Sequence, residues 1–264
     1  MKQIDKEVVL YGGLVKIKYF DQYHQYFVNG EKALGVTAIT GLIDKSRPLM
    51  YWATKLAYDY LAEIHIKGKK IELEDIEIAC KLHMQKKKEA ADFGTQVHEW
   101  AEKYIKAKVK ERRDIEMPKD PRVLNGVIAF LKWVESHKIK FLESERIVYS
   151  KKHKYIGTMD CVFTMGTEKH KVRHIGEFKT SSGIYEEMIF QITAYEEAYR
   201  EETGENCGDK YILRFDKKTA EFEPYRIPTE NHKKDISAFL GLLAAKKRLI
   251  ELEQYHKNPI FAIK

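Results

Sequence analysis

Hydrophobic and polar residues alternate along this chain with two different periods, and each period predicts a different kind of element. Over residues 7–40, short runs of β-branched and aromatic residues are separated by turn residues, which predicts β-hairpins. Asn29-Gly30 is the strongest of these turn signals. Helical spacing of apolar residues then recurs over residues 47–66, 73–109 and 122–137, with a candidate interruption at residues 92–94.

The second half of the chain mixes strand-like and helix-like patterns. Predicted strands cover residues 141–150, 156–164, 172–180, 211–216 and 220–227, and predicted helices cover residues 184–203 and 229–254. A turn is predicted at residues 166–169. Together the elements predict an α+β protein with an α/β core, in which helices flank a mixed central sheet. N-terminal β-hairpins and a helical lobe are expected beside this core.

The length of 264 residues suits one large domain. Within the single domain, 1–264, four segments follow one another. They are the N-terminal hairpins (1–45), a helical segment (46–140), the central sheet with the helix that follows it (141–228), and a C-terminal helix and tail (229–264).

Three charged residues interrupt the predicted strands at 156–164 and 172–180. Side chains alternate along a strand, so Glu177 and Lys179 leave the same face, and a hairpin would set Asp160 beside them. Two carboxylates next to an amine suit a hard cation such as Mg²⁺. The alternative is an exposed cross-strand ion pair, which antiparallel sheets often carry.

Further polar residues lie on the predicted helices. Gln191 and Tyr195 are four residues apart, so they share a helix face near the end of the strand that carries Glu177. His98 lies beside an apolar helix face, where a histidine is either a hydrogen-bonded core residue or a ligand.

In this order, the motifs Gly157-x-x-Asp160, Glu177-x-Lys179-Thr180-Ser181 and Gln191-x-x-x-Tyr195 resemble the PD-(D/E)XK nuclease superfamily. They are most similar to its RecB-type branch, which includes phage exonucleases and mitochondrial genome-maintenance exonucleases. The upstream helical motif of that branch, Gly-Thr-x-x-His-x-x-x-Glu, is matched from Gly94 to Glu102. The resemblance covers about the middle hundred residues, and four ordered motifs are more specific than any one of them.

The resemblance implies a restriction-endonuclease-like core and assigns a role to each matching residue. The implied catalytic residues are Asp160, Glu177, Lys179, Gln191 and Tyr195. The implied metal ligands are His98, Asp160, Glu177 and the backbone carbonyl of Phe178. Glu145 either binds a second cation through water or forms an ion pair with a neighbour, and Glu102 could orient the imidazole of His98. Expected substrate contacts are Thr95, Thr180, Ser181, Gln191 and Tyr195.

The activity that the resemblance implies is metal-dependent hydrolysis of DNA. One or two Mg²⁺ or Mn²⁺ ions are the expected cofactors, and linear DNA, duplex or single-stranded, is the expected partner. An exonuclease that acts in recombination, repair or replication is the first hypothesis, together with contacts to recombination or replication proteins. A non-catalytic nucleic-acid-binding module on the same fold and a DNA endonuclease are the alternatives.

Charge and cysteine content narrow this picture. Lys and Arg exceed Asp and Glu by 47 to 40, and the resulting net charge of +7 favours a polyanionic partner. The exposed run Lys86, Lys87 and Lys88 is either a solvated helix face or a phosphate contact. Three cysteines cannot supply the four ligands of an iron–sulfur cluster, and they suit a reducing compartment. The sequence shows no signal-peptide core and no apolar run of about twenty residues, so an intracellular protein without membrane contact is expected.

Aromatic residues are frequent in the predicted N-terminal hairpins. They either serve as good strand formers or offer rings for base stacking. The residues in question are Tyr11, Tyr19, Tyr23, Tyr26 and Phe27.

Overall fold

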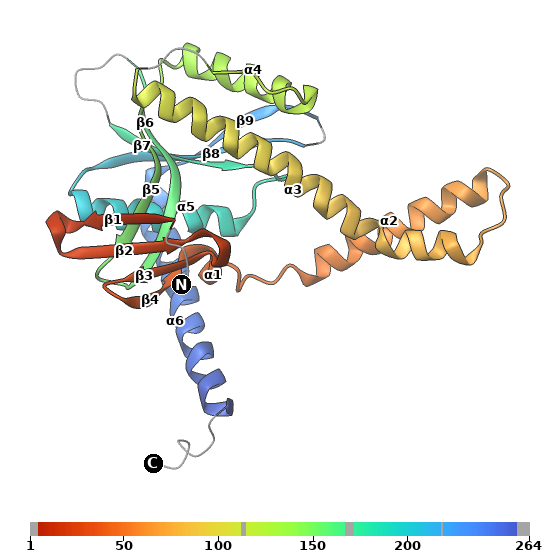
Figure 1. Ribbon diagram of the computed structural model, residues 1–264, viewed down its shortest axis with the longest axis horizontal. Coiled ribbons are helices and arrows are strands. Elements are labelled where there is room, and N and C mark those ends of the chain that lie inside the picture. Colours follow the sequence, from red (N-terminus) through yellow and green to blue (C-terminus); the bar gives the residue numbers. More distant parts are fainter. Residues whose placement is uncertain (1–4, 112–114, 167–171, 218, 258–264) are drawn as a thin grey trace.

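A computed structural model describes residues 5–111, 115–166, 172–217 and 219–257. The strands of the described residues form one mixed sheet in the order β1-β2-β3-β4-β6-β7-β8-β9, and β5 pairs with β6 outside this path. Helices lie on both faces of the sheet (Figure 1). The prediction of an α+β protein with a mixed central sheet flanked by helices is confirmed. Most of the turn predicted at 166–169, part of the connector before residue 121 and the tail after residue 257 lie outside the described residues.

The N-terminal hairpins belong to the central sheet. They comprise β1 (Lys6–Leu10), β2 (Val15–Phe20), β3 (Gln25–Val28) and β4 (Glu31–Gly35), joined by the short 3-10 helices η1 (Tyr11–Gly13) and η2 (Asp21–Tyr23) and by a turn at Asn29 and Gly30. Both turn residues have positive φ, as a two-residue hairpin turn requires. β4 lies within the β structure predicted over residues 7–40, but its parallel pairing with β6, which joins the hairpins to the core, was not predicted. A short helix, α1 (Val36–Thr40), follows it.

Two long helices form an arm that projects away from the sheet (Figure 1). α2 (Ser46–Ile66) has no buried residue, and the first half of α3 (Leu73–Val109) buries only Ala79. α3 runs unbroken through residues 92–94, where an interruption was predicted. From Phe93 onward its apolar face is buried against the sheet, so tertiary packing holds the helix straight at this point.

The second half of the chain supplies the remaining five strands of the described sheet. Its strands are β5 (Lys140–Ser150), β6 (Tyr155–Thr164), β7 (Arg173–Lys179), β8 (Cys207–Phe215) and β9 (Phe222–Ile227). β7 and β8 are parallel, and α5 (Glu186–Thr203) makes the crossover between them. The helix α4 (Pro121–Ser136) precedes β5, and a 3-10 turn, η3 (Thr229–Asn231), precedes α6 (His232–Lys257).

Two apolar cores lie on opposite faces of this sheet. On one face, α3 and α4 enclose an aromatic core around the fully buried ring of Phe130. On the other face, α1, α5 and α6 cover a core that includes Met159 and Ile192. α3 and α5 therefore approach the sheet from opposite sides, and both carry predicted site residues.

A buried ion network ties the start of α6 to α5. The carboxylate of Glu196 accepts hydrogen bonds from Lys210 Nζ (2.8 Å) and binds Nδ1 of His232 (2.8 Å), while Nε2 of His232 contacts Glu197 (3.0 Å). The two carboxylates raise the pKa of His232 to about 9, so its imidazolium form is favoured in the folded protein.

Candidate active site

Carboxylates from three neighbouring strands meet where the pairing of β6 and β7 ends. Cys161 and Gly176 form the last pair in this direction, and beyond it Oδ2 of Asp160 accepts a hydrogen bond from the backbone N–H of Phe178 (2.6 Å). The side chain of Asp160 thus replaces a ladder bond. On the other side of β6, the register places Glu145 opposite Asp160, because Ser144 pairs with Cys161 and Arg146 pairs with Met159.

Glu177, on β7, lies at the centre of the hydrogen-bond network. Its Oε1 accepts from Nζ of Lys179 (2.9 Å) and from Nε2 of Gln191 (2.8 Å). The Nε2 group of Gln191 also contacts Oη of Tyr195 (2.9 Å). Oε2 of Glu177 is buried and has no hydrogen-bond partner within the described part of the chain. One oxygen of this carboxylate is therefore satisfied by two donors, while the other is left without one.

The two motif glycines allow helices to approach the strands closely. A Cβ atom on Gly157 would lie 2.4 Å from Cε1 of Tyr195, so the tyrosine ring rests directly on the backbone of β6. A Cβ atom on Gly94 would lie 2.9 Å from Oγ1 of Thr180, where α3 meets the end of β7. In both places a larger residue would displace the helix that carries a site residue.

α3 brings His98 to the carboxylates. Nδ1 of His98 lies 3.8 Å from Oδ2 of Asp160, and the imidazole packs edge-to-face on the ring of Phe178. Glu102, one turn further along α3, forms an ion pair with Lys106. The imidazole thus reaches the end of β6 from one face of the sheet, and Gln191 reaches β7 from the other.

Burial and mutual repulsion shift the pKa values of this cluster. Burial, with the charge of Asp160 next in importance, raises the pKa of Glu145 to about 8 and that of Glu177 to about 7. Burial likewise raises the pKa of Asp160 to about 6, against the opposing charge of Lys179. Burial disfavours the charge on Lys179, but Glu177 and Asp160 outweigh it and raise its pKa. Partial burial lowers the pKa of His98, so the imidazole is neutral at pH 7.

The donor groups of this cluster are of the kinds that bind divalent cations, but they are not arranged as a complete coordination sphere. Among the described residues, no group of three or more His, Cys, Asp or Glu side chains is arranged to hold a metal ion. The partnerless Oε2 of Glu177 and the crowded carboxylates nevertheless lack the positive charge that a hard cation would supply. The groups that could hold it are Asp160, Glu177, His98 and the backbone carbonyl of Phe178.

Glu145 differs from the other two carboxylates in its backbone. Its φ is +52°, in the left-handed region, and its carbonyl accepts a hydrogen bond from Nζ of Lys6 (2.6 Å). A non-glycine residue in this conformation is strained, and such residues concentrate at functional sites. Within the described part of the chain, the carboxylate of Glu145 forms no ion pair. The neighbouring Arg146 pairs with Glu143 and Glu202 instead.

The residues predicted to contact substrate are in unequal positions. The Thr180 side chain lies against Gly94, and the hydroxyl of Ser181 already donates to the carbonyl of Gly183 (2.6 Å). Thr95 is exposed on α3. Lys86, Lys87 and Lys88 are exposed in the N-terminal half of α3, which belongs to the arm. Lys86 forms an ion pair with Glu89. At about 1.5 Å per residue, Lys88 lies roughly 15 Å along the helix from His98.

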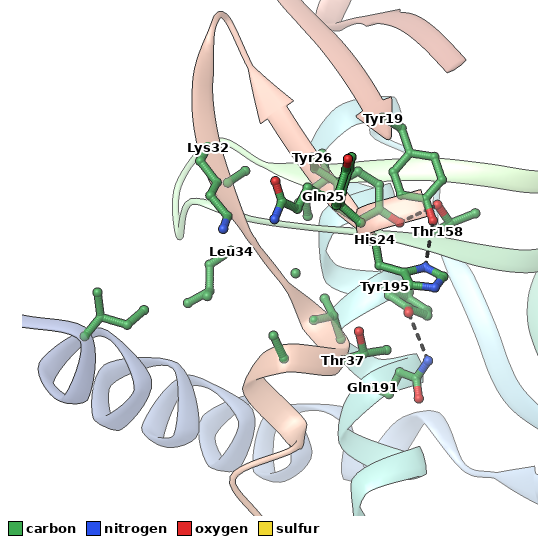
Figure 2. A pocket seen from close by; sticks show the side chains of 18 of the residues that line it. Tyr19, His24, Gln25, Tyr26, Lys32, Leu34, Thr37, Thr158, Gln191 and Tyr195 are labelled. Carbon is green, nitrogen blue, oxygen red and sulfur yellow. Dashed lines mark hydrogen bonds between the residues drawn. The ribbon is translucent and has the colours of Figure 1, made fainter. Parts of the chain in front are cut away.

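A cleft of about 850 Å³ extends from the cluster to the N-terminal hairpins. Glu177, Gln191 and Tyr195 line one part of it, and Tyr26 and Lys32 line another (Figure 2). Sequence reasoning did not place the hairpins beside the cluster. The signal that could have found this arrangement is β4, because its parallel pairing with β6 sets the hairpins next to Gly157.

Comparisons with known proteins find similarity only at the level of solved structures. No family model matches this chain, and no curated protein matches it. Among solved structures it is similar to an alkaline exonuclease from Laribacter hongkongensis, with 12% identity over 58% of this chain and 81% of that chain, at a TM-score of 0.29. The same exonuclease in complex with dAMP gives 13% identity over 58% of this chain and 82% of that chain, also at 0.29. The roles of individual residues therefore depend on the side-chain geometry described above.

No helix within the described residues has both the length and the apolar character that a membrane crossing requires.

The shifted carboxylates predict how stability depends on pH and on divalent cations. Because their folded-state pKa values are raised to about 6 to 8, the folded protein binds more protons than the unfolded chain between about pH 4 and pH 8. In EDTA, the free energy of unfolding is therefore expected to fall as the pH rises through this window. Mn²⁺ should raise the melting temperature more at pH 8 than at pH 5.5. Thermal unfolding at both pH values measures this difference.

Because His232 also titrates in this direction, the experiment needs the comparison with and without Mn²⁺. Its raised pKa contributes stability that is present below about pH 6.5 and is lost as the pH rises through about 9, which is the same direction. Mn²⁺ relieves only the carboxylate cluster, so the recovery at pH 8 separates the two causes. Equal shifts at both pH values would contradict a cation site at the carboxylates.

Proposed function

We propose that this protein is a divalent-metal-dependent DNA nuclease with a PD-(D/E)XK-type site, of the RecB-type branch that its motifs resemble. The observation that supports the proposal best is the arrangement around Glu177. One of its carboxylate oxygens is bound by Lys179 and Gln191, and the other is buried without a partner among the described residues. Asp160, on the neighbouring strand β6, accepts a hydrogen bond from the backbone N–H of Phe178. Glu177 itself lines a cleft large enough to admit a substrate.

The proposed reaction is hydrolysis of a phosphodiester bond. A bound Mg²⁺ or Mn²⁺ ion would polarise the phosphate and lower the pKa of a water molecule. Asp160 and Glu177 would supply anionic oxygens to that ion, and His98 would supply a neutral imidazole nitrogen, which suits Mn²⁺. Glu145, whose carboxylate has no ion pair among those of the described residues, is the candidate ligand for a second ion.

Lys179 and Gln191 have different tasks in this proposal. The neighbouring carboxylates hold Lys179 in its charged form, so it serves to stabilise negative charge that develops on the phosphate oxygens, and not as a general base. Gln191 donates to Glu177 and to Tyr195, so it fixes the orientation of the carboxylate. Tyr195 in turn is held against Gly157, which makes α5 a rigid support for the site.

The proposed substrate is linear DNA, and the proposed mode of attack is exonucleolytic. The net charge of +7 suits a polyanion, and the cleft leads past the hairpins to the carboxylate of Glu177. Such an activity belongs to the processing of DNA ends during recombination, repair or replication.

End-labelled linear DNA and covalently closed circles test this proposal directly. With Mg²⁺ or Mn²⁺, the linear molecules are expected to shorten progressively and to release short products, while the closed circles persist. EDTA should abolish cleavage of the linear molecules with either metal, because it removes the cation that the carboxylates would bind. The products are measured by gel electrophoresis over time.

Two other results would replace the proposal. Cleavage of closed circles as fast as linear molecules would identify an endonuclease. Binding of DNA without cleavage, in either metal, would identify a non-catalytic binding module on this fold.

A further inference from the structure

The aromatic residues of the N-terminal hairpins fall into two groups. Oη of Tyr11 donates to the carbonyl of Tyr149 (2.7 Å), and Phe27 packs edge-to-face on Phe20, so both have partners within the fold. Tyr19, Tyr23 and Tyr26, which have partners too, differ in that they line the cleft that leads to Glu177. Tyr19 and Tyr26 are opposite each other in the β2–β3 register, which sets both rings on the same face, and Tyr23 joins them from η2.

The rings of the cleft are held in place at their polar ends. Tyr19 and Tyr26 stack on each other with their centroids 4.6 Å apart (Figure 2). Oη of Tyr26 contacts Oγ1 of Thr158 on β6 (2.9 Å), while Oη of Tyr19 donates to Asp21 (3.0 Å). These bonds fix two rings as a platform. Tyr23, which is 45% exposed, extends the platform towards solvent.

A tight turn adds a further ring beside this platform. His24 has a φ of +45°, in the left-handed region, and its Nδ1 lies 3.1 Å from Oη of Tyr19 (Figure 2). The conformation places an imidazole in the lining of the cleft next to the tyrosines. The turn thus adds a fourth planar group to the same wall.

The rest of the cleft suits a nucleic acid strand. Glu177 is the one carboxylate among its described lining residues, and it lies at the proposed reaction site. Elsewhere the lining offers the ammonium of Lys32 and neutral polar groups such as those of Gln25 and Thr37. A polyanion therefore meets no second negative group among the described lining residues before it reaches Glu177, and the nearby carboxylate of Asp21 is bound by Oη of Tyr19.

We infer that the cleft binds an unpaired nucleic acid strand whose bases stack on the platform of Tyr19, Tyr23 and Tyr26, and that this platform makes the protein selective for single-stranded ends. The inference rests on the proposed nuclease function, and it adds the strand preference and the residues that set it. Stacking accepts any base, because every base has a π-face. The platform thus holds the strand without reading its sequence.

The preference for an unpaired strand follows from the use of ring faces. In a duplex each base is stacked on its neighbours, and separating one step costs a few kcal/mol. An unpaired strand offers its base faces at a much smaller cost. The cleft also has the size of a small-molecule pocket, which suits a few nucleotides and not the width of a duplex.

Binding in EDTA tests the inference without any need for cleavage. Fluorescence anisotropy would measure the affinity for a labelled thymine oligonucleotide and for a blunt duplex of the same length. The double variant Tyr19→Leu with Tyr23→Leu is expected to bind the oligonucleotide roughly 5- to 50-fold more weakly, because it removes two stacking surfaces. Its affinity for the duplex should change less than about twofold.

Tyr225→Leu is the matched control, because Tyr225 is an exposed tyrosine on β9, at the opposite edge of the sheet. It should bind both ligands as the wild type does. Tyr23→Leu alone keeps the test sharp if the double variant is unstable, since Tyr23 is substantially exposed. It should weaken binding of the oligonucleotide by about fivefold.

The outcomes separate this inference from the proposed nuclease function. Folded variants that bind the oligonucleotide normally would overturn the inference, even if the wild type cleaves DNA. An equal loss of affinity for the duplex would overturn the preference for single strands. Selective loss for the oligonucleotide would support the platform, and if the wild type then cleaved no DNA with Mg²⁺ or Mn²⁺, only the nuclease proposal would fail.

Discussion

Glu177→Gln is expected to reduce DNA cleavage by roughly a thousandfold or more while leaving the protein folded. The glutamine keeps the size of the side chain and an oxygen that can accept from Lys179 and Gln191. It removes the negative charge that would bind the cation, and a loss of several kcal/mol in transition-state stabilisation converts at about 1.4 kcal/mol per tenfold. Initial rates on end-labelled DNA with Mg²⁺ and Mn²⁺ measure the effect.

The same variant should be more stable than the wild type in EDTA at pH 8. Burial and the neighbouring Asp160 raise the pKa of Glu177 to about 7, so its charge destabilises the folded protein above that pH. Asp160→Asn should behave in the same way, and calorimetry should show weaker Mn²⁺ binding in both variants. Glu99→Gln is the control, because Glu99 is exposed on α3 and pairs with Lys103. Unchanged cleavage and unchanged Mn²⁺ affinity in both site variants would refute the assignment.

Lys179→Met is expected to lower kcat by about 100- to 1,000-fold, the range seen when one preorganised donor to a developing negative charge is removed. The ammonium of Lys179 is held beside Glu177 and Asp160, and it is charged before substrate binds. Its contribution should therefore appear mainly in the transition state, so KM should change little. Steady-state kinetics on linear DNA separate the two parameters.

Lys103→Met provides the comparison for Lys179→Met, because it removes a lysine that is exposed on α3 and pairs with Glu99. Its kcat should remain within about twofold of the wild type. If Lys179→Met retained wild-type turnover, Lys179 would serve only as the ion-pair partner of Glu177. A large rise in KM with constant kcat would assign it to substrate binding.

Sequence patterns predicted most elements of this fold, because local periodicity is strong in both the long helices and the core strands. β5, β6, β7 and α5 lie within two residues of their predicted bounds. The pairing of β4 with β6 was not predicted, because it joins segments more than a hundred residues apart. The interruption predicted at residues 92–94 is absent because Phe93 is buried against the sheet, and this packing outweighs the low helix propensity of Gly94.

The candidate site could be predicted in part from strand alternation. Glu177 and Lys179 leave the same face and form a hydrogen bond, as the alternation of side chains requires. The contact of Gln191 with Tyr195 follows from four-residue helical spacing, whereas its bond to Glu177 depends on how α5 packs on β7. The left-handed φ of Glu145 could not be predicted, because no glycine or asparagine marks that position. The place of the aromatic platform also depends on tertiary structure, since only the β4–β6 pairing sets it beside the cluster.

The unbroken course of α3 has a mechanical consequence. The helix is about 35 Å long from its first turn to His98, and its buried part begins near Gly94, about one turn before His98, which is where a tilt of the exposed part would pivot. If α3 stays straight, a tilt of about 5° swings the tip of the arm by roughly 3 Å and moves His98 by about 0.5 Å the other way. A movement of the arm would therefore shift His98 relative to Asp160 by a much smaller distance. Catalytic geometry is sensitive to displacements of this size.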